Sequence, residues 1–181
     1  MRNISVIVRI ASILGAVALL AAAPAAAKDL SFRADLRGDA PSSTTGSKAT
    51  GHATILVHTE TQTVDVLLNV DGIRLDDLWT KLRNSPKGAI HLHIYGSRDH
   101  SANASAALIF PLPYGSDYAA TAKGFKVDVK GAPYAAGAKL VGSDASFDEF
   151  VSSLRNGRLV LNIHTNANPN GEISGDVVPA N

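Results

Sequence analysis

Three histidines lie in similar surroundings in two distant parts of the chain. His91 and His93 stand one residue apart in the apolar run AIHLHIYG (89–96), and His164 follows the apolar run LVLNI (159–163). Imidazole nitrogens are ligands that suit copper, zinc, nickel and iron. Three imidazoles that converge on one point would therefore bind one transition-metal ion.

Both runs have the period of a β-strand, in which alternate side chains point to opposite faces. The histidines lie opposite the aliphatic stripes, which consist of Ile90, Leu92 and Ile94 in one run and Leu159, Leu161 and Ile163 in the other. The outward faces then carry His91, His93, Tyr95, Val160, Asn162 and His164. If the two strands are neighbours, this facing predicts a metal site formed by His91, His93 and His164. Copper is preferred over zinc because the affinity of nitrogen sites without thiolates peaks at copper.

An isolated H-x-H pair on a strand is usually two surface imidazoles, and the sequence alone does not decide between this alternative and a metal site. The third histidine, which lies on the corresponding face of a second predicted strand, favours a metal or ligand site. Because coordination needs neutral imidazoles, the metal affinity is expected to fall below the ordinary histidine pKa of about 6.5.

Other polar residues are candidates for supporting roles. His52 and His58 share a face of HATILVH, but their separation predicts surface positions. His100, in RDHSANAS, is predicted to be a solvated loop residue. Glu172 and Asp176 share one face of the last predicted strand, where they either orient a ligand histidine or are solvated.

The sequence lacks the motifs of several other chemistries. It has no G-x-S-x-G and no P-loop, and it contains no cysteine that would serve as a thiol nucleophile or form a disulfide. Serine, histidine and aspartate all occur, but no spacing favours a triad, and an inventory of residue types does not establish one. The sequence therefore predicts no catalytic residue.

The elements that must position the histidines are mostly strands. Period-two alternation predicts strands over 29–36, 52–58, 63–70, 106–112, 124–130, 158–165 and 172–178. The four-residue connection 59–62 is typical of a hairpin, and 38–51 reads as a loop rich in Ser, Thr and Gly. Many short strands with one or two short helices predict an all-β fold, an antiparallel β-sandwich or a Greek-key barrel.

Two segments have helical spacing instead. In SFDEFVSSLRNG (146–157), Ser146 and Glu149 form a capping box and Gly157 stands where a C-terminal cap belongs. The apolar stripe of this predicted helix consists of Phe147, Phe150, Val151 and Leu154. The segment RLDDLWTKLRN (74–84) predicts a short helix or turn.

The N-terminus resembles a secretory signal peptide. Arg2 and Arg9 flank a mostly apolar opening, and the uncharged, alanine-rich run 10–27 follows. We therefore expect residues 1–27 to be cleaved and 28–181 to form a single domain that is secreted or periplasmic. A retained membrane anchor is the alternative.

The charge of the predicted mature domain is close to zero. Removing Arg2 and Arg9 leaves 15 of the 17 basic side chains against 16 acidic ones. This balance gives no electrostatic reason to expect nucleic acid or an anionic membrane as a partner. The oligomeric state is not predicted.

The stretches AIHLHIYG and LVLNIHTNANPNGEISGDV resemble the two characteristic parts of the chordin (CHRD) domain family. The preceding FDEFVSSLRNG is similar as well, and the resemblance covers nearly all of 30–178. It implies an immunoglobulin-like β-sandwich outside the cytoplasm, mostly without an assigned activity in bacteria and part of an antagonist of secreted growth factors in animals. This chain departs from the pattern in that the glycine after H-x-H is delayed to Gly96, and 73–89, with Trp79, looks like an insertion.

The H-x-H strand is also similar to the copper strand of copper/zinc superoxide dismutases. The chain lacks the cysteines of that family's disulfide and has no clear counterpart of its zinc loop. Three hypotheses follow. The leading one is an exported, non-enzymatic chordin-type domain that binds a metal ion or an extracytoplasmic protein partner. The others are a copper-dependent redox enzyme and a structural or adhesive module with incidental histidines.

Overall fold

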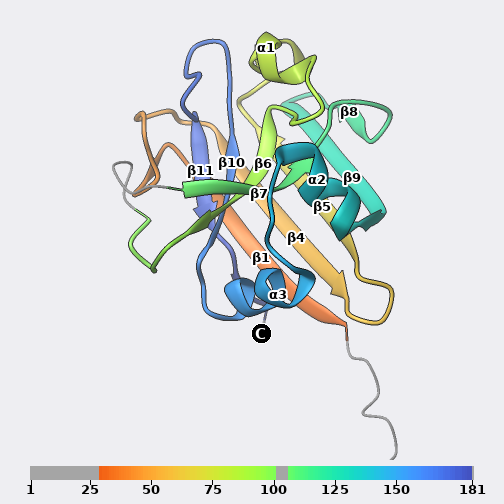
Figure 1. The fold of residues 1–181 in the computed structure, drawn as a ribbon. Helices are drawn as coiled ribbons and strands as arrows, with labels where there is room; N and C mark the ends of the chain where they lie inside the picture. The colour runs from red at the N-terminus through yellow and green to blue at the C-terminus, as the bar shows by residue number, and fades with distance from the viewer. Residues whose placement is uncertain (1–28, 101–105, 181) are drawn as a thin grey trace, which may run out of the picture.

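The computed structural model describes residues 29–100 and 106–180 (Figure 1). The predicted signal peptide, 1–27, and its cleavage site lie outside these described residues. None of the helices in the described ranges has the length and apolar character needed to cross a membrane.

Strands dominate the described part of the chain. They are β1 (Leu30–Arg37), β2 (Asp39–Ala40), β3 (Ser43–Thr44), β4 (Thr50–His58), β5 (Thr63–Asp71), β6 (Ile90–Tyr95), β7 (Ala106–Leu112), β8 (Tyr118–Ala120), β9 (Gly124–Pro133), β10 (Leu159–Ile163), β11 (Ile173–Asp176) and β12 (Val178–Pro179). The helices are the 3-10 helix η1 (Leu75–Asp77) and the α-helices α1 (Thr80–Arg83), α2 (Tyr134–Val141) and α3 (Phe147–Arg155).

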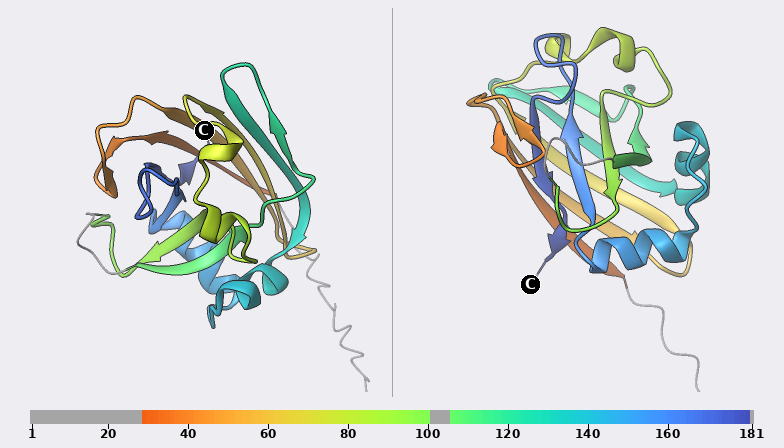
Figure 2. Two further views of the ribbon diagram at one scale, coloured as in Figure 1. Left: turned by 90° about the horizontal axis from the view of Figure 1, so that it is seen from above. Right: turned by 60° about the vertical axis from the view of Figure 1, so that its left-hand side comes forward.

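One antiparallel sheet contains nearly all of these strands, in the order β7-β6-β10-β11-β1-β4-β5-β9-β8, with β12 beside β1. Seen from above, the sheet curls so that β6 and β7 face the long strands β4, β5 and β9 across the core (Figure 2). The predicted all-β class, a sandwich or barrel, is thus confirmed, and its two halves belong to a single continuous sheet.

The period-two pattern correctly predicted which side chains face the core. β4 and β5 form the expected hairpin across 59–62. The predicted inward stripe of β5 is fully buried and consists of Val64, Val66, Leu68 and Val70. Alternation in the sequence therefore reflects burial of one face of each strand against the core.

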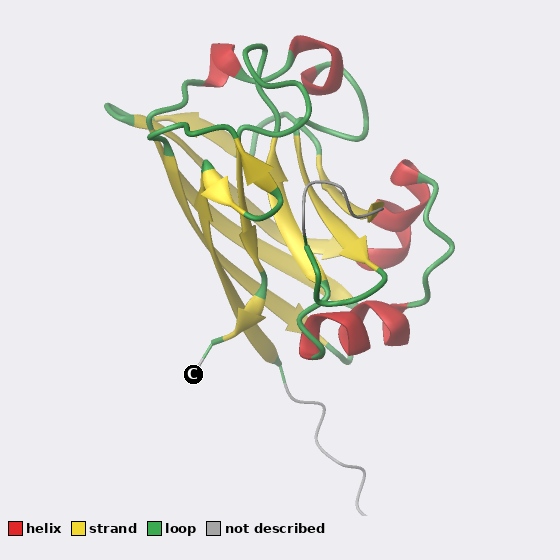
Figure 3. Ribbon diagram, turned by 90° about the vertical axis from the view of Figure 1, so that its left-hand side faces the viewer, coloured by secondary structure: helices red, strands yellow, loops and turns green. Residues whose placement is uncertain are grey.

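The two segments with helical spacing in the sequence form helices in the structure. In α3, the Ser146 side chain accepts a hydrogen bond from the backbone N–H of Glu149, and the reciprocal bond of the capping box is present. Gly157 follows the helix with a positive φ of 60°, so the predicted helix is confirmed at both ends. The predicted short helix or turn at 74–84 appears as η1 and α1. Figure 3 shows these two at one end of the sheet, with α2 and α3 along its side.

Two elements differ from the sequence-based expectation. α2 was not predicted, and its Gly137 lies against the ring of Phe110, so close that a Cβ there would be 2.5 Å from the ring. The segment 38–51 is more than a loop, because β2 and β3 form a small two-stranded sheet within it. Ser42 bonds to Ser174, which fastens this small sheet to the outward face of β11.

Candidate metal centre

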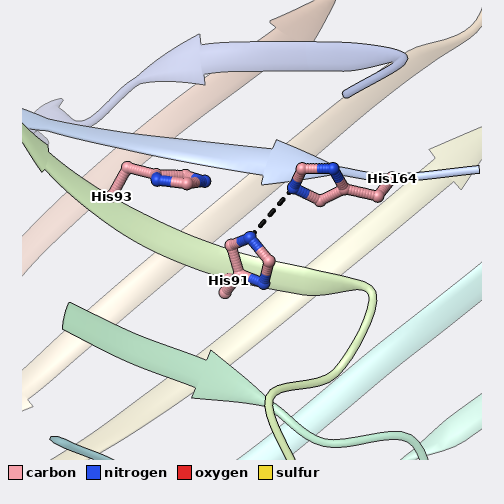
Figure 4. Close-up of side chains that lie close together, drawn as sticks. All are labelled: His91, His93 and His164. Carbon is pink, nitrogen blue, oxygen red and sulfur yellow. Dashed lines mark hydrogen bonds between the residues drawn. The ribbon is translucent and has the colours of Figure 1, made fainter. Parts of the chain in front are cut away.

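The pairing of β6 with β10 brings the predicted histidines together. His91 lies opposite Asn162, and His93 lies opposite Val160, on neighbouring antiparallel strands. His164 follows the last residue of β10, on the same face as Asn162. One ligand nitrogen from each of the three histidines lies within 4.8 Å of the others. The predicted convergence is confirmed, and Figure 4 shows the rings of His91 and His93 on β6 turned toward the ring of His164.

The face that carries the histidines is not exposed to solvent as expected. His91 is 2% exposed and His164 is 7% exposed, while Val160 and Asn162 beside them are also buried. The alternative of two solvated imidazoles is therefore wrong. Polar segments cover this face, since Ser43 bonds to the carbonyl of Gly171 and the backbone N–H of Trp79 bonds to the carbonyl of His164.

The hydrogen bonds of two rings point their Nε2 atoms at each other. The Nδ1 atom of His164 lies 2.9 Å from the Pro169 carbonyl oxygen, and that of His91 lies 3.3 Å from the Gly88 carbonyl oxygen. Because a carbonyl oxygen only accepts, these contacts favour the tautomer with the proton on Nδ1 in both rings. With both rings in this tautomer, two Nε2 lone pairs face each other at 2.9 Å. A proton on one Nε2 would make this contact a hydrogen bond, and a metal ion between the two nitrogens would equally relieve it.

His93 completes the cluster and has no partner of its own. Its ring centroid lies 4.8 Å from that of His91 and 6.1 Å from that of His164. Both of its ring nitrogens are buried, and neither has a hydrogen-bond partner among the described residues. A buried polar nitrogen without a partner is costly, and coordination of an ion would satisfy it.

Burial keeps all three imidazoles neutral. Loss of solvation is the main cause that lowers the pKa of His91 to about 3, and repulsion from His164 and His93 adds to it. Burial and His164 lower the pKa of His93 to about 4, and burial also lowers the pKa of His164. The expected onset of proton competition near pH 6.5 is therefore wrong, because protons compete for these nitrogens only in more acidic solution.

The segment 73–89 provides the wall beside His164. Leu78 forms an isolated bridge with Thr165, and the Asn166 side chain accepts from the backbone N–H of Thr80. The ring of Trp79 is partly buried, with its centroid 6.5 Å from that of His164. The segment that looks like an insertion in the sequence is thus part of the surroundings of the centre.

His100 was predicted to be solvated, and this prediction is wrong. Its side chain is buried, with Nδ1 2.7 Å from a carboxylate oxygen of Asp176 and the ring 4.8 Å from that of Tyr95. Asp176 on β11 lies opposite Val160 on β10, and Val160 lies opposite His93 on β6. The side chains of Asp176 and His100 are therefore on the same face of the sheet as the cluster. His100 is nevertheless outside the group of three.

The other candidates bond to residues outside the cluster. His52 is exposed and pairs with Asp35, as predicted for a surface residue. His58 is partly buried between Asp29 and Asp65. Asp176 bonds to His100 and not to a histidine of the cluster. Glu172 bonds to the side chains of Thr165 and Ser47.

The comparisons with known proteins give one positive result. A family model described as the CHRD domain matches residues 32–177, a range that includes the whole sheet core and all three clustered histidines. No curated protein and no solved structure matches the chain. The match covers most of the sequence and agrees with the two histidine-bearing stretches from which the resemblance was read. This chain belongs to the CHRD domain family.

Proposed function

We propose that the protein is a non-enzymatic CHRD domain of the extracytoplasmic space that binds one transition-metal ion through His91, His93 and His164. The observation that carries the proposal is the pair of Nε2 atoms that face each other at 2.9 Å while both Nδ1 atoms face carbonyl oxygens. A metal ion would relieve this contact and would also give one of the two buried nitrogens of His93 a partner.

The donor set, three imidazoles without a thiolate, supports copper. Two nitrogens that are each about 2.0 Å from one ion are about 2.9 Å apart when their angle at the ion is about 90°, and about 3.3 Å apart in a tetrahedral site. The separation of 2.9 Å between the Nε2 atoms of His91 and His164 is compatible with one shared ion. The whole set, however, spans up to 4.8 Å and would have to contract around the ion, since two such ligands are at most about 4 Å apart. Tetragonal nitrogen sites are typical of Cu(II) and Ni(II), and copper binds more tightly in the general affinity order.

The residues around the cluster would orient the ligand rings toward the ion. The Gly88 and Pro169 carbonyls fix the tautomer of two ligand rings, as is usual for histidines that bind metals. Three ligands leave an open position, at which a bound ion would act as a Lewis acid or accept a side chain from a partner.

Titration of metal-free protein with Cu(II) and Zn(II) tests the proposal. Trp79 is the only tryptophan of the chain and lies beside His164, so paramagnetic Cu(II) should quench its fluorescence at one equivalent. We expect His91→Ala, His93→Ala and His164→Ala each to weaken copper binding by more than about 100-fold, beyond the effect of losing an outer partner. His52→Ala, at an exposed histidine, is the matched control and should bind like the wild type.

The same protein samples separate the alternatives. Equal and weak copper binding by the wild type and all four variants would contradict the metal site and leave the structural or adhesive module. Superoxide turnover by the copper-loaded wild type, abolished in His91→Ala, would identify a redox enzyme and contradict the non-enzymatic assignment. Copper binding without turnover is the result that we expect.

A further inference from the structure

The turn between β10 and β11 supplies the carbonyl that orients His164. The Asn168 backbone N–H donates to Thr165 Oγ1 at 3.1 Å, and the Thr165 backbone N–H donates to the Asn168 carbonyl at 3.3 Å. This closed pair of bonds places the next carbonyl, that of Pro169, 2.9 Å from His164 Nδ1. The position of the carbonyl therefore depends on the Thr165 hydroxyl.

A carboxylate holds that hydroxyl in place. Thr165 Oγ1 donates to Glu172 Oε2 at 2.5 Å, and Ser47 Oγ donates to Glu172 Oε1 at 2.7 Å. Because the Thr165 hydroxyl has a single proton, donation to Glu172 leaves its lone pairs to accept from Asn168. The Glu172 backbone N–H also donates to the carbonyl of Ile163 at 2.7 Å. Glu172 thus joins both ends of the turn and ties the turn to the 45–47 segment.

The turn is also pressed against the strand that carries the ligand. Gly171 has a φ of 117°, and a Cβ there would lie 2.5 Å from the side-chain amide of Asn162. Asn162 is two residues before His164, so the turn rests on the same face of β10. A shift of the turn would consequently move the Pro169 carbonyl relative to the imidazole.

We propose that Glu172 is a positioning residue for the metal centre, which acts through Thr165 and the Pro169 carbonyl to keep His164 in the Nδ1–H tautomer. In this tautomer the Nε2 lone pair points to the cluster. Loss of a partner that orients a ligand histidine typically costs about 10- to 100-fold in metal affinity. The inference rests on the proposed function for its effect on metal binding, but its effect on the tautomer does not require a metal.

The first experiment therefore uses metal-free protein. Nitrogen-15 NMR of the imidazoles should show His164 as the Nδ1–H tautomer in the wild type and in Glu172→Gln, whose amide still accepts from Thr165. In Glu172→Ala and in Thr165→Val we expect a mixture of tautomers. An unchanged His164 tautomer in both Glu172→Ala and Thr165→Val would overturn the inference.

Copper affinity, measured by competition with a chelator, provides the second readout. Glu172→Ala and Thr165→Val should each bind copper about 10- to 100-fold more weakly than the wild type, and the double variant should be no weaker than either, because both act on one contact. Glu60→Ala, which removes an exposed glutamate from the β4–β5 connection, is the matched control. Wild-type affinity in a folded Glu172→Ala would contradict the role, whereas failure of the wild type itself to bind copper would contradict only the proposed function.

Discussion

Two aspartate–histidine pairs of the same chemistry lie in different surroundings, and this difference predicts different energies. Asp176 bonds to His100, whose side chain is 4% exposed and whose Nε2 is buried without a partner. Asp35 bonds to His52, and both of these side chains are mostly exposed. Removing Asp176 leaves a buried imidazole with no partner at either nitrogen, a penalty of about 1–3 kcal/mol.

We therefore expect Asp176→Ala to lower the free energy of unfolding by about 1–3 kcal/mol and Asp35→Ala by less than about 1 kcal/mol. Urea denaturation of the two variants beside the wild type measures both values. Equal losses would show that His100 reaches solvent in the folded protein. The sequence could not distinguish these pairs, because the burial of His100 depends on a residue 76 positions later in the chain.

At the scale of single elements, α3 makes the clearest prediction. Phe150 is fully buried, and its ring is stacked on that of Tyr134 with centroids 4.6 Å apart. Phe150→Ala should lower the free energy of unfolding by about 3–5 kcal/mol, the usual penalty for removing a buried aromatic ring. Phe147→Ala, at a partly exposed position of the same helix, should cost less. A loss under about 1 kcal/mol for Phe150→Ala would mean that α3 does not pack on the sheet.

The elements also show which structural features a sequence can reveal. α3 was predictable because Ser146, Glu149 and Gly157 mark its ends within the chain itself. α2 begins after Pro133 without a side-chain cap, and its small residues form no strong stripe, so it depends on contact with Phe110. The facing of His91, His93 and His164 followed from strand period alone. The burial of that face did not, because distant loops cover it.

For the chain as a whole, export remains a prediction with a direct test. The first strand begins at Leu30, shortly after the predicted cleavage site. Mass spectrometry of protein from the extracytoplasmic fraction should find a mature N-terminus at Lys28, within one or two residues. Recovery of the chain with Met1 in a membrane fraction would support the retained anchor instead.

The stability of the whole molecule should depend on pH through the histidine cluster. In metal-free protein the pKa values of His91 and His93 are lowered to about 3 and about 4, whereas in the unfolded chain they are near 6.5. Between pH of about 6.5 and about 4 the unfolded chain binds protons that the folded chain does not, so the free energy of unfolding falls as the pH falls. The pKa of His58 is raised by Asp29 and Asp65, which opposes this trend because that histidine favours the folded state in acid.

Since each unit of pKa depression corresponds to about 1.4 kcal/mol for one group, His91 and His93 should each remove about 3 kcal/mol of stability between pH 7 and pH 4, a loss that His58 partly offsets. Urea denaturation with a chelator present, repeated across this range, measures the loss. His91→Phe keeps a ring at the buried position without a titratable nitrogen, so its stability should fall less over the same range, whatever its value at pH 7. Parallel pH profiles for the wild type and His91→Phe would mean that His91 accepts a proton in the folded protein as easily as in the unfolded chain. That result would contradict a desolvated cluster of neutral imidazoles, the condition on which metal coordination at this face depends.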